Sequence, residues 1–336
     1  MVRAASIKDV ANQAGVAVGT VSNVLNYPDR VSSTTRDRVL AAIAELGFVR
    51  NDAARQLRAG RSRTMGMIVL DAGNPFFSSV ARAAEEAAAR AGSAVLLGNS
   101  SHDPRRERHY IELFEEQRMQ GILISPTGDV SARLAAAEAA GLKIVLVDAP
   151  SDGQRFSSVA VDNAAGGYVA VRHLLDAGRR RIAFVGGNAT LRQVQDRLAG
   201  ARRAVAEVPG ATLEVLTAAD LTVLGGRGVG DDLRRRTPGT APDALFCAND
   251  LLALGVIQSL AMLGGLRIPE DIALIGYDDI DFAASAVVPL SSIRQPAELI
   301  GRTAVELLLE QTADEPPAPR SVVFTPELVA RASTGH

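Results

Sequence analysis

From Thr64 onward, short apolar segments alternate with amphipathic segments of helical periodicity. Near-continuous apolar strands separated by helices are typical of parallel sheets that are covered on both faces. There are too many such strands for one compact sheet, so we predict an α/β body of two doubly wound lobes that divide near residue 162. The predicted strands include Met67–Leu70, Ala94–Leu97, Ile122–Ile124, Ile144–Val147, Ile182–Val185, Leu213–Leu216, Ala244–Cys247, Ile272–Ile275 and Ser321–Phe324, and helices are predicted over about 75–90, 104–118 and 296–310.

The segment before Thr64 has a different, all-helical pattern. Residues 7–25 predict two short helices that are joined by a tight turn at Gly15, with apolar residues along one face of each helix. A third helix is predicted to begin after Ser32 and to end at Gly47. This pattern is typical of a helix-turn-helix that places its second helix in the DNA major groove, although an ordinary helical hairpin has the same periodicity.

Charge separates the helical segment from the rest of the chain. Residues 1–63 carry ten basic and five acidic side chains, a net charge of +5, whereas the remainder carries −7. Thr20, Ser22 and Asn23 lie on the open side of the second predicted helix. A basic head on an acidic body predicts that the head contacts a polyanion, here double-stranded DNA. The alternative is a solvated basic face without a partner.

Polar and aromatic residues follow the predicted strands of the body, where parallel α/β sheets bind their ligands. Asn74, Phe76 and Phe77 follow the first strand, in a chain with nine Phe, four Tyr and no Trp. Aromatic rings can pack on the C–H face of a sugar while amides and carboxylates bond to its hydroxyls, although one of the two Phe could equally be core. The other strand-end residues could each cap the next helix instead, and Asp250 is expected to do so. They are Asn99, Asp148, Arg192, Gln193, Arg197, Asn249, Asp250, Asp278 and Asp279.

Catalytic and metal-binding arrangements are not indicated, so no cofactor and no enzyme activity are predicted. The four histidines lack the spacing of metal ligands. The glycine-rich run 225–230 does not directly follow a strand, and we interpret it as a loop that enters a helix. Cys247, the single cysteine, is expected to be a buried thiol. With no apolar run of about 18 residues and no secretory signal, we expect a cytoplasmic protein that is nucleoid-associated when bound to DNA.

Ten short runs of this sequence match one family pattern: Ile7–Ala11, Gly15–Val16, Thr20–Ser22, Val24–Asn26, Ala44–Phe48, Asp196–Gly200, Ala248–Asp250, Ala253–Gly255, Gly276–Asp279 and Leu328–Ser333. With these runs the chain resembles, along nearly its whole length, the lactose/galactose-repressor family of bacterial transcription regulators. The resemblance implies a periplasmic-binding-protein-like body and a sequence-specific DNA-binding regulator, expected to be a repressor. Its operator affinity would be controlled by a small molecule, expected to be a sugar, between the lobes. The alternative is a transport-type solute-binding protein, which shares the two-lobed body but has no DNA-binding head.

The resemblance also implies the division of the chain and its assembly. Two subunits would pair through their bodies and place two heads on a pseudo-palindromic operator. A hinge helix would fold only on specific DNA, where Leu57 matches the leucine that wedges into the central base step of the minor groove. Some members tetramerise through a leucine-heptad tail; this chain stops at His336 without one, so a homodimer is expected. The expected parts are a DNA-binding domain (1–50), a hinge helix and linker (51–63), a first lobe (64–162 and 293–323) and a second lobe (163–292 and 324–336).

Residue by residue, the resemblance implies two sets of contacts. The expected DNA-binding residues are Lys8, Val18, Gly19, Thr20, Ser22, Asn23, Asn26, Ser32, Thr35, Asn51, Arg55 and Leu57. The positions that match the family's effector contacts are Asn74, Phe76, Phe77, Asp148, Arg197, Asn249 and Asp278, and the Asn-Pro-Phe-Phe run is similar to that of members that bind pentoses. The full set of expected effector-binding residues also includes Asn99, Arg192 and Gln193, which were named above for their places after predicted strands, and Gln295.

Two head residues depart from the family pattern. Asn23 stands where arginine is frequent, and Gly19 replaces a residue that reads bases in many members. Asparagine pairs well with adenine and cannot make the bidentate contact of arginine with guanine. We therefore predict an operator that differs at those half-site positions.

Overall fold

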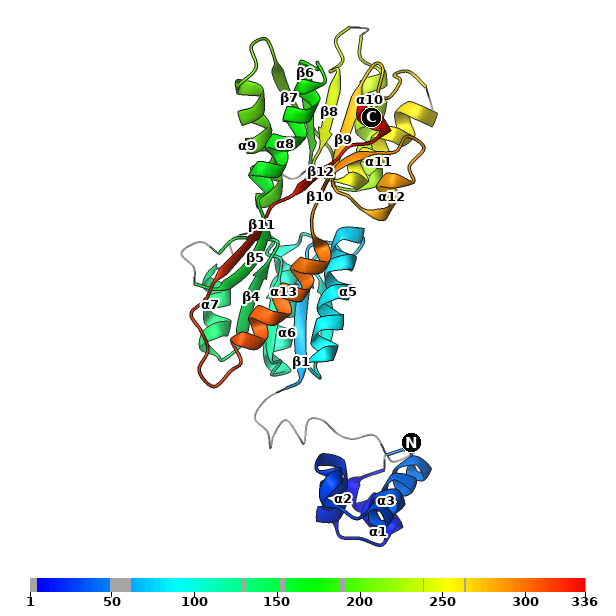
Figure 1. Cartoon of the computed structure of the whole chain (residues 1–336), viewed down its shortest axis with the longest axis vertical. Helices are drawn as coiled ribbons and strands as arrows, with labels where there is room; N and C mark the ends of the chain where they lie inside the picture. The colour runs from blue at the N-terminus through cyan, green and yellow to red at the C-terminus, as the bar shows by residue number, and fades with distance from the viewer. Residues whose placement is uncertain are drawn as a thin grey trace. The chain divides into compact units, whose positions relative to one another are not determined.

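The structure, a computed structural model shown in Figure 1, describes residues 5–48, 62–128, 131–151, 155–187, 191–237, 239–262 and 264–335. The chain divides into two compact units, Met1–Arg61 and Ser62–His336. We call their described parts the head and the body. Asn51, Arg55 and Leu57 lie outside the described residues, so the hinge helix stays a prediction. No helix among the described residues is both long enough and apolar enough to span a membrane.

The head is a small helical bundle, as its sequence pattern predicts. Ser6 caps the first helix through a reciprocal pair of hydrogen bonds with Asp9, and Gly15 ends it at φ 63°. The third helix has Ser32 at its N-cap position and ends at Gly47, which has φ 57°. The buried core is small and aliphatic, built from Val10, Ala11, Ala14, Val21, Val24, Val39 and Ala42. The elements are α1 (Ile7–Ala14), α2 (Val18–Asn26), the 3₁₀ turn η1 (Pro28–Arg30) and α3 (Ser33–Leu46).

The body contains two six-stranded sheets, which confirms the prediction of two doubly wound lobes (Figure 1). The first sheet has the order β11-β5-β4-β3-β1-β2 and is parallel throughout. The second has the order β12-β10-β9-β8-β6-β7, and only β12 runs antiparallel to its neighbour. The strands are β1 (Thr64–Val69), β2 (Ala94–Asn99), β3 (Gly121–Ile124), β4 (Lys143–Val147), β5 (Ser157–Val161) and β11 (Ser321–Phe324) in the first lobe, and β6 (Arg181–Gly186), β7 (Thr212–Thr217), β8 (Ala244–Cys247), β9 (Ala273–Asp278), β10 (Ser291–Arg294) and β12 (Glu327–Val329) in the second.

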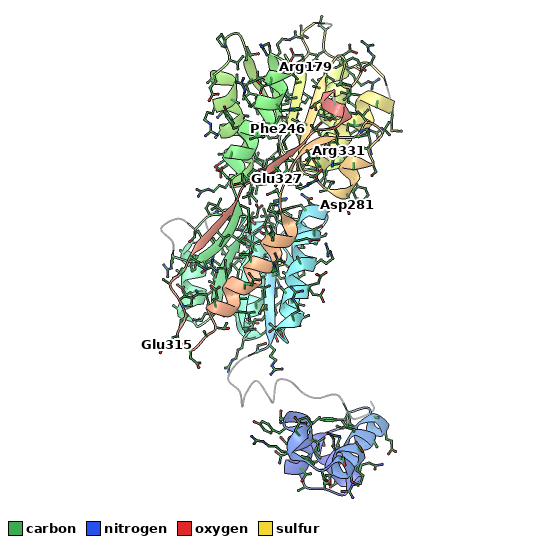
Figure 2. All side chains as sticks on the ribbon, viewed as in Figure 1. Arg179, Phe246, Asp281, Glu315, Glu327 and Arg331 are labelled. Atoms are coloured by element: carbon green, nitrogen blue, oxygen red, sulfur yellow. The ribbon has the colours of Figure 1, made fainter. Side chains whose placement is uncertain are left out.

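Helices cover both faces of each sheet, so alternate residues of a strand enter different cores. In the first lobe, Met67 of β1 packs in the same core as α5 and α13, whereas its neighbour Ile68 packs in the core that holds α6 and α7. In the second lobe, Phe246 lies inside the core and meets Phe184 edge-on, with ring centroids 5.3 Å apart (Figure 2). The helices are α5 (Pro75–Arg90), α6 (Pro104–Glu116), α7 (Ser131–Ala139) and α13 (Ala297–Glu310) in the first lobe, and α8 (Asn163–Asp176), α9 (Arg192–Ala206), α10 (Val223–Arg234), α11 (Asp250–Ile257) and α12 (Asp281–Ala284) in the second.

Within the described residues the chain passes between the lobes three times. The first crossover leads from β5 to α8, the second from β10 to α13, and the third from β11 to β12. Because of the second and third crossovers, the last part of the chain alternates between the lobes. Glu327 of β12 lies where the two lobes meet (Figure 2). The boundaries predicted for the four parts of the chain stay a prediction.

Two expectations from the sequence were wrong. The glycine-rich run 225–230 lies inside α10 rather than in a loop. Gly226 of this run is needed for packing, because a Cβ there would lie 2.0 Å from the carbonyl oxygen of Leu252 in α11. The second error is the cap of α11: Asn249, not Asp250, is the N-cap residue, and its side chain accepts a hydrogen bond from the backbone N–H of Leu252.

Candidate functional site

The head presents the second helix of its helix-turn-helix to solvent. Val18, Gly19 and Asn23 are exposed on α2, and the expected contact residues Thr20 and Ser22 are half-buried. Lys8, Asn26 and Ser32 are also exposed, and Thr35 is half-buried and accepts a hydrogen bond from Ser32. An exposed helix face with short polar side chains fits the dimensions of the DNA major groove.

One exposed pair of the head was missed by the sequence analysis. The guanidinium of Arg30 lies 4.9 Å from the ring centroid of Tyr27, just after α2. Tyr27 is 53% exposed, which is unusual for a large aromatic side chain of so small a bundle. The signal was present in the sequence as an aromatic residue directly after the predicted second helix.

The body holds a cleft between the lobes, at the carboxyl ends of the strands of both sheets. Its volume is about 460 Å³, including the mouth that opens to solvent. Eight of the eleven residues expected to bind an effector line it. The full lining is Leu70, Asp71, Asn74, Phe76, Phe77, His102, Asp148, Leu191, Gln193, Val194, Arg197, Leu221, Asn249 and Asp278.

Three expected effector residues lie outside this lining. Asn99 accepts hydrogen bonds from the backbone N–H groups of Ala72 and Ser101, which holds the loops beside the cleft. Arg192 is exposed and lines a second cavity, which shares Asp148 and Gln193 with the first. Gln295 lies behind the cleft wall, where its Nε2 donates to Oδ1 of Asp278 at 2.7 Å.

The first lobe contributes an amide and two aromatic rings from the start of α5. Asn74 is the N-cap of this helix, and its Oδ1 accepts from the backbone N–H of Phe76 at 3.0 Å. Pro75 occupies the first turn, where a missing N–H costs nothing. The rings of Phe76 and Phe77 are almost fully buried and meet edge-on with centroids 5.0 Å apart. One short sequence thus caps the helix and forms an apolar wall of the cleft.

The second lobe contributes Arg197, whose guanidinium is fixed on three sides. Its Nε donates to Oδ1 of Asn163 at 2.8 Å, and its Nη1 donates to the carbonyl oxygen of Ala248 at 2.6 Å. The guanidinium carbon lies 3.6 Å from the ring centroid of Tyr277, a distance at which a cation and an aromatic face attract each other. Arg197 is 5% exposed, so this charge is presented to the cleft in a fixed position.

Two buried carboxylates face this guanidinium. Oδ1 of Asp278 lies 3.9 Å from Nη1 of Arg197. Burial raises the pKa of Asp148 to about 7, because the favourable charge of Arg197 offsets only part of the lost hydration and Asp278 opposes ionisation further. Burial also raises the pKa of Asp278, against the lowering effects of Arg197, Asn74 and Gln295. Arg197 therefore faces two buried carboxylates that ionise less readily than carboxylates in water.

Both carboxylates sit on strained backbone at the ends of their strands. Asp148 has φ 55° and Asp278 has φ 109°, a region that residues with a side chain rarely adopt. Such conformations persist where the surrounding structure holds them, and they concentrate at ligand sites. Asp250, which is fully buried behind the cleft, accepts from the hydroxyl of Ser292 and the backbone N–H of Ile280 and so fixes the loop after Asp278.

Burial also shifts the pKa values of His102 and Cys247 in the body. Burial lowers the pKa of His102, which favours the neutral imidazole. Cys247 is fully buried, as predicted, and burial raises the pKa of its thiol. No three His, Cys, Asp or Glu side chains are grouped to hold a metal ion in the part of the chain that the structure describes.

Comparisons with known proteins agree with both parts of this geometry. Residues 6–51 match the family described as bacterial regulatory proteins of the lacI family, and residues 171–334 match a periplasmic binding protein-like domain. The HTH-type transcriptional repressor PurR of Aliivibrio fischeri (strain MJ11) is 34% identical over 332 residues, which cover 98% of both chains. The chain belongs to the lacI family of bacterial regulatory proteins. It is a helix-turn-helix transcriptional regulator with a small-molecule effector domain.

Solved structures of lacI-family proteins have the same fold. The lac repressor dimer bound to operator and the anti-inducer ONPF has a TM-score of 0.83 and 27% identity, with 99% of each chain covered. A lacI-family transcriptional regulator from Enterococcus faecium with bound ribose has a TM-score of 0.72 and 27% identity, and covers 80% of this chain and 98% of its own. The membership assigns DNA binding to the head and effector binding to the body.

Proposed function

We propose that the effector is an uncharged sugar, and that a pentose such as D-ribose is the first candidate. The single observation that carries this proposal is the combination, in one buried cleft, of the Phe76–Phe77 wall with the hydrogen-bonding groups of Asn74, Arg197 and Asp278. Apolar faces and a few fixed polar groups are what a sugar ring with hydroxyls on its edge requires. The related regulator with bound ribose supports this choice.

Charge argues against a phosphorylated ligand. Asp148 and Asp278 outnumber Arg197, and both carboxylates are almost fully buried. A phosphate group would lose its hydration and face two carboxylates in a site of low polarity. A neutral polyol can instead donate hydroxyl hydrogens to the carboxylates and accept from the guanidinium.

Thermal unfolding against a ligand panel tests this proposal. A ligand that binds only the folded protein raises the midpoint temperature of unfolding by mass action. D-ribose and D-xylose should raise the midpoint, whereas ribose 5-phosphate should not. A planar nucleobase, which could stack on the two phenylalanines, is included as a competing ligand. A shift with the nucleobase or the sugar phosphate, and none with any free sugar, would contradict the proposal.

We propose further that the head reads DNA through α2, with Val18, Gly19, Thr20, Ser22 and Asn23 at the base edges. The remaining expected contacts of the head, Lys8, Asn26, Ser32 and Thr35, would bind the DNA backbone. Asn51, Arg55 and Leu57 of the hinge would contact the DNA as well, with Leu57 as the wedge in the central base step of the minor groove. Selection of duplexes from random-sequence DNA tests this set, and a pseudo-palindrome should emerge. Leu57→Ala should weaken binding to that duplex and leave nonspecific, salt-dependent binding unchanged. Equal loss of both would exclude a wedge at residue 57.

A homodimer follows as the proposed assembly, because both lobes expose large apolar side chains. Leu96 and Leu97 are nearly half exposed on β2, an edge strand of its sheet. In the second lobe, Leu224 and Val287 are more than 70% exposed, and Phe282 is 58% exposed. Such side chains mark protein interfaces when they lie together. Leu224→Glu should shift the sedimentation of the protein from dimer to monomer, and unchanged sedimentation would exclude Leu224 from the dimer interface.

We propose that the body binds its ligand without catalysis, in the cytoplasm. The relatives are transcriptional repressors, and the helix-turn-helix head argues against a transport-type solute-binding protein. Recovery of the panel ligand unchanged after prolonged incubation with the protein tests this proposal, and conversion of the ligand would overturn it.

A further inference from the structure

Asn163 lies at the first crossover, where the chain leaves β5 of the first lobe and enters α8 of the second. It is 6% exposed, and both ends of its amide are bonded. Its Oδ1 accepts from Nε of Arg197 at 2.8 Å, and its Nδ2 donates to the carbonyl oxygen of Val161 at 3.3 Å. One side chain therefore connects the cleft guanidinium to the last residue of a first-lobe strand.

The backbone around Arg197 packs closely against α8, the helix that begins at Asn163. The helices α8 and α9 pack so closely that a Cβ on Gly167 would lie 2.0 Å from the carbonyl oxygen of Arg197. A Cβ on Gly200 would lie 2.0 Å from the carbonyl oxygen of Ala164. Because the two helix backbones touch at these glycines, the side chain of Arg197 is the part of this residue that can move most readily relative to α8. Its position is then set by Asn163, Ala248 and Tyr277.

A parallel contact exists at the second crossover. Gln295 directly follows β10, and its Nε2 donates to Asp278, the carboxylate that faces Arg197. Each of these two charged cleft residues is thus held by an amide at a different crossover. A ligand that attracts either charge pulls on a segment about which the lobes must turn.

We infer that Asn163 is a positioning residue of the effector response, which transmits the position of Arg197 to the first crossover and thereby sets the angle between the lobes. The inference rests on the proposed function, since it supplies the route by which a ligand in the cleft changes the body. A ligand that draws the guanidinium away from Asn163 leaves Oδ1 without this donor, so the amide can rotate and weaken the bond from its Nδ2 to the carbonyl oxygen of Val161. The interlobe angle responds without any change in the core of either lobe.

The experiment measures the distance between the lobes directly, in the full chain and without DNA or ligand. Ala89→Cys at the end of α5 and Ala206→Cys at the end of α9 are exposed sites for spin labels, one on each lobe. The native Cys247 is fully buried and is spared by the label. Double electron–electron resonance spectroscopy then gives the distribution of distances between the two spin labels, in the labelled protein and in variants made in that background.

Four variants separate the two contacts of Asn163. Asn163→Ala removes both, and Arg197→Met removes the guanidinium. Each should shift and broaden the distance distribution, and the double variant should shift it no further than either single variant, because the two residues form one link. Asn163→Asp keeps an acceptor for Arg197, but its carboxylate cannot donate to the carbonyl oxygen of Val161 and repels it. This variant should therefore also shift the distance distribution. Thr222→Ala is the matched control, since it removes a helix cap of the same lobe without touching a crossover.

Two results would overturn the inference. One is an unchanged distance in Asn163→Ala with a lowered unfolding midpoint, which would make Asn163 a local hydrogen bond of the fold. The other is a pair of shifts that add in the double variant, which would show that the residues act separately. Because neither DNA nor ligand is used, a failure of the sugar panel leaves this result unaffected.

Discussion

The amide of Asn74 and the carboxylate of Asp278 join the two lobes across the cleft, with Nδ2 donating to Oδ2 at 3.1 Å. The same asparagine caps α5 through its oxygen, and the same carboxylate accepts from Gln295 at the second crossover. A helix start of the first lobe is therefore connected through two hydrogen bonds to the segment that leads back into that lobe.

Substitutions of Asn74 can separate its two roles. Asn74→Ala should lower the free energy of unfolding by about 1 kcal/mol through the lost cap alone, and it also removes the interlobe donor. Asn74→Asp keeps an acceptor for the N–H of Phe76, so the cap survives, but it places a carboxylate against Asp278. We expect the Asp variant to be the more stable of the two in urea and to bind D-ribose at least as weakly. Wild-type affinity in the Asp variant would show that this contact plays no part in binding.

The stability of the body should depend on pH through Asp148. Its pKa is about 7 in the folded protein and about 3.9 in an unfolded chain. The folded state therefore holds the proton to higher pH, and the contribution of Asp148 to stability is present below pH 4 and is lost as the pH rises to 7. Asp148→Asn cannot ionise, so its stability relative to the wild type should increase with pH across this window. Chemical denaturation at several pH values measures the difference.

Asp271→Asn is the control of opposite sign. Hydrogen bonds from Arg267 hold the pKa of Asp271 at about 2. This contribution is present above pH 4 and is lost as the pH falls toward 2. The Asn variant should therefore be less stable than the wild type at neutral pH and approach it in acid. A rise in relative stability with pH for both variants would contradict the assignment to Asp148.

Two glycines of α10 should respond to alanine in opposite directions. Gly226→Ala pushes a Cβ against the carbonyl of Leu252 and should force α10 and α11 apart, destabilising the body by more than about 1 kcal/mol. Gly228 is exposed in the same helix, and its Cβ would meet open space. Gly228→Ala should stabilise the helix by up to about 1 kcal/mol. Thermal unfolding of the two variants measures the contrast, and equal effects would rule out close packing as the reason for Gly226.

Asn23→Arg should change which bases the head selects. Asparagine recognises adenine, whereas arginine recognises guanine through two hydrogen bonds. Duplex selection with the variant should therefore replace a base pair in each half-site with one that carries guanine in the major groove. Asn12→Arg, on the exposed face of α1, is a control for added charge and should strengthen binding without changing the selected sequence. An identical selected sequence for wild type and Asn23→Arg would remove Asn23 from the base contacts.

The sequence predicted the helix-turn-helix and most strands because both depend on local periodicity. It missed three strands. Two of them, β5 and β10, begin with paired serines, Ser157–Ser158 and Ser291–Ser292, which do not match an apolar run. These serines are buried because partners far along the chain satisfy them: Ser158 bonds to Ser321, and Ser292 bonds to Asp250. The third, β12, has only three residues and pairs with the edge of its sheet.

The sequence by itself determined the fold class, the family and the polar residues at the strand ends, because spacing along one segment carries that information. The tertiary structure decided which of those residues share a cleft. Asn99 ends β2 and Gln295 follows β10, much as Asp148 follows β4. Yet Asn99 supports loops beside the cleft, and Gln295 bonds to Asp278 from behind the cleft wall. Asn163 looks like any residue at a helix start until Arg197 is placed beside it. Contacts between residues tens or hundreds of positions apart depend on the order of the strands in each sheet and on the points where the chain passes between the lobes. Local sequence patterns contain neither kind of information.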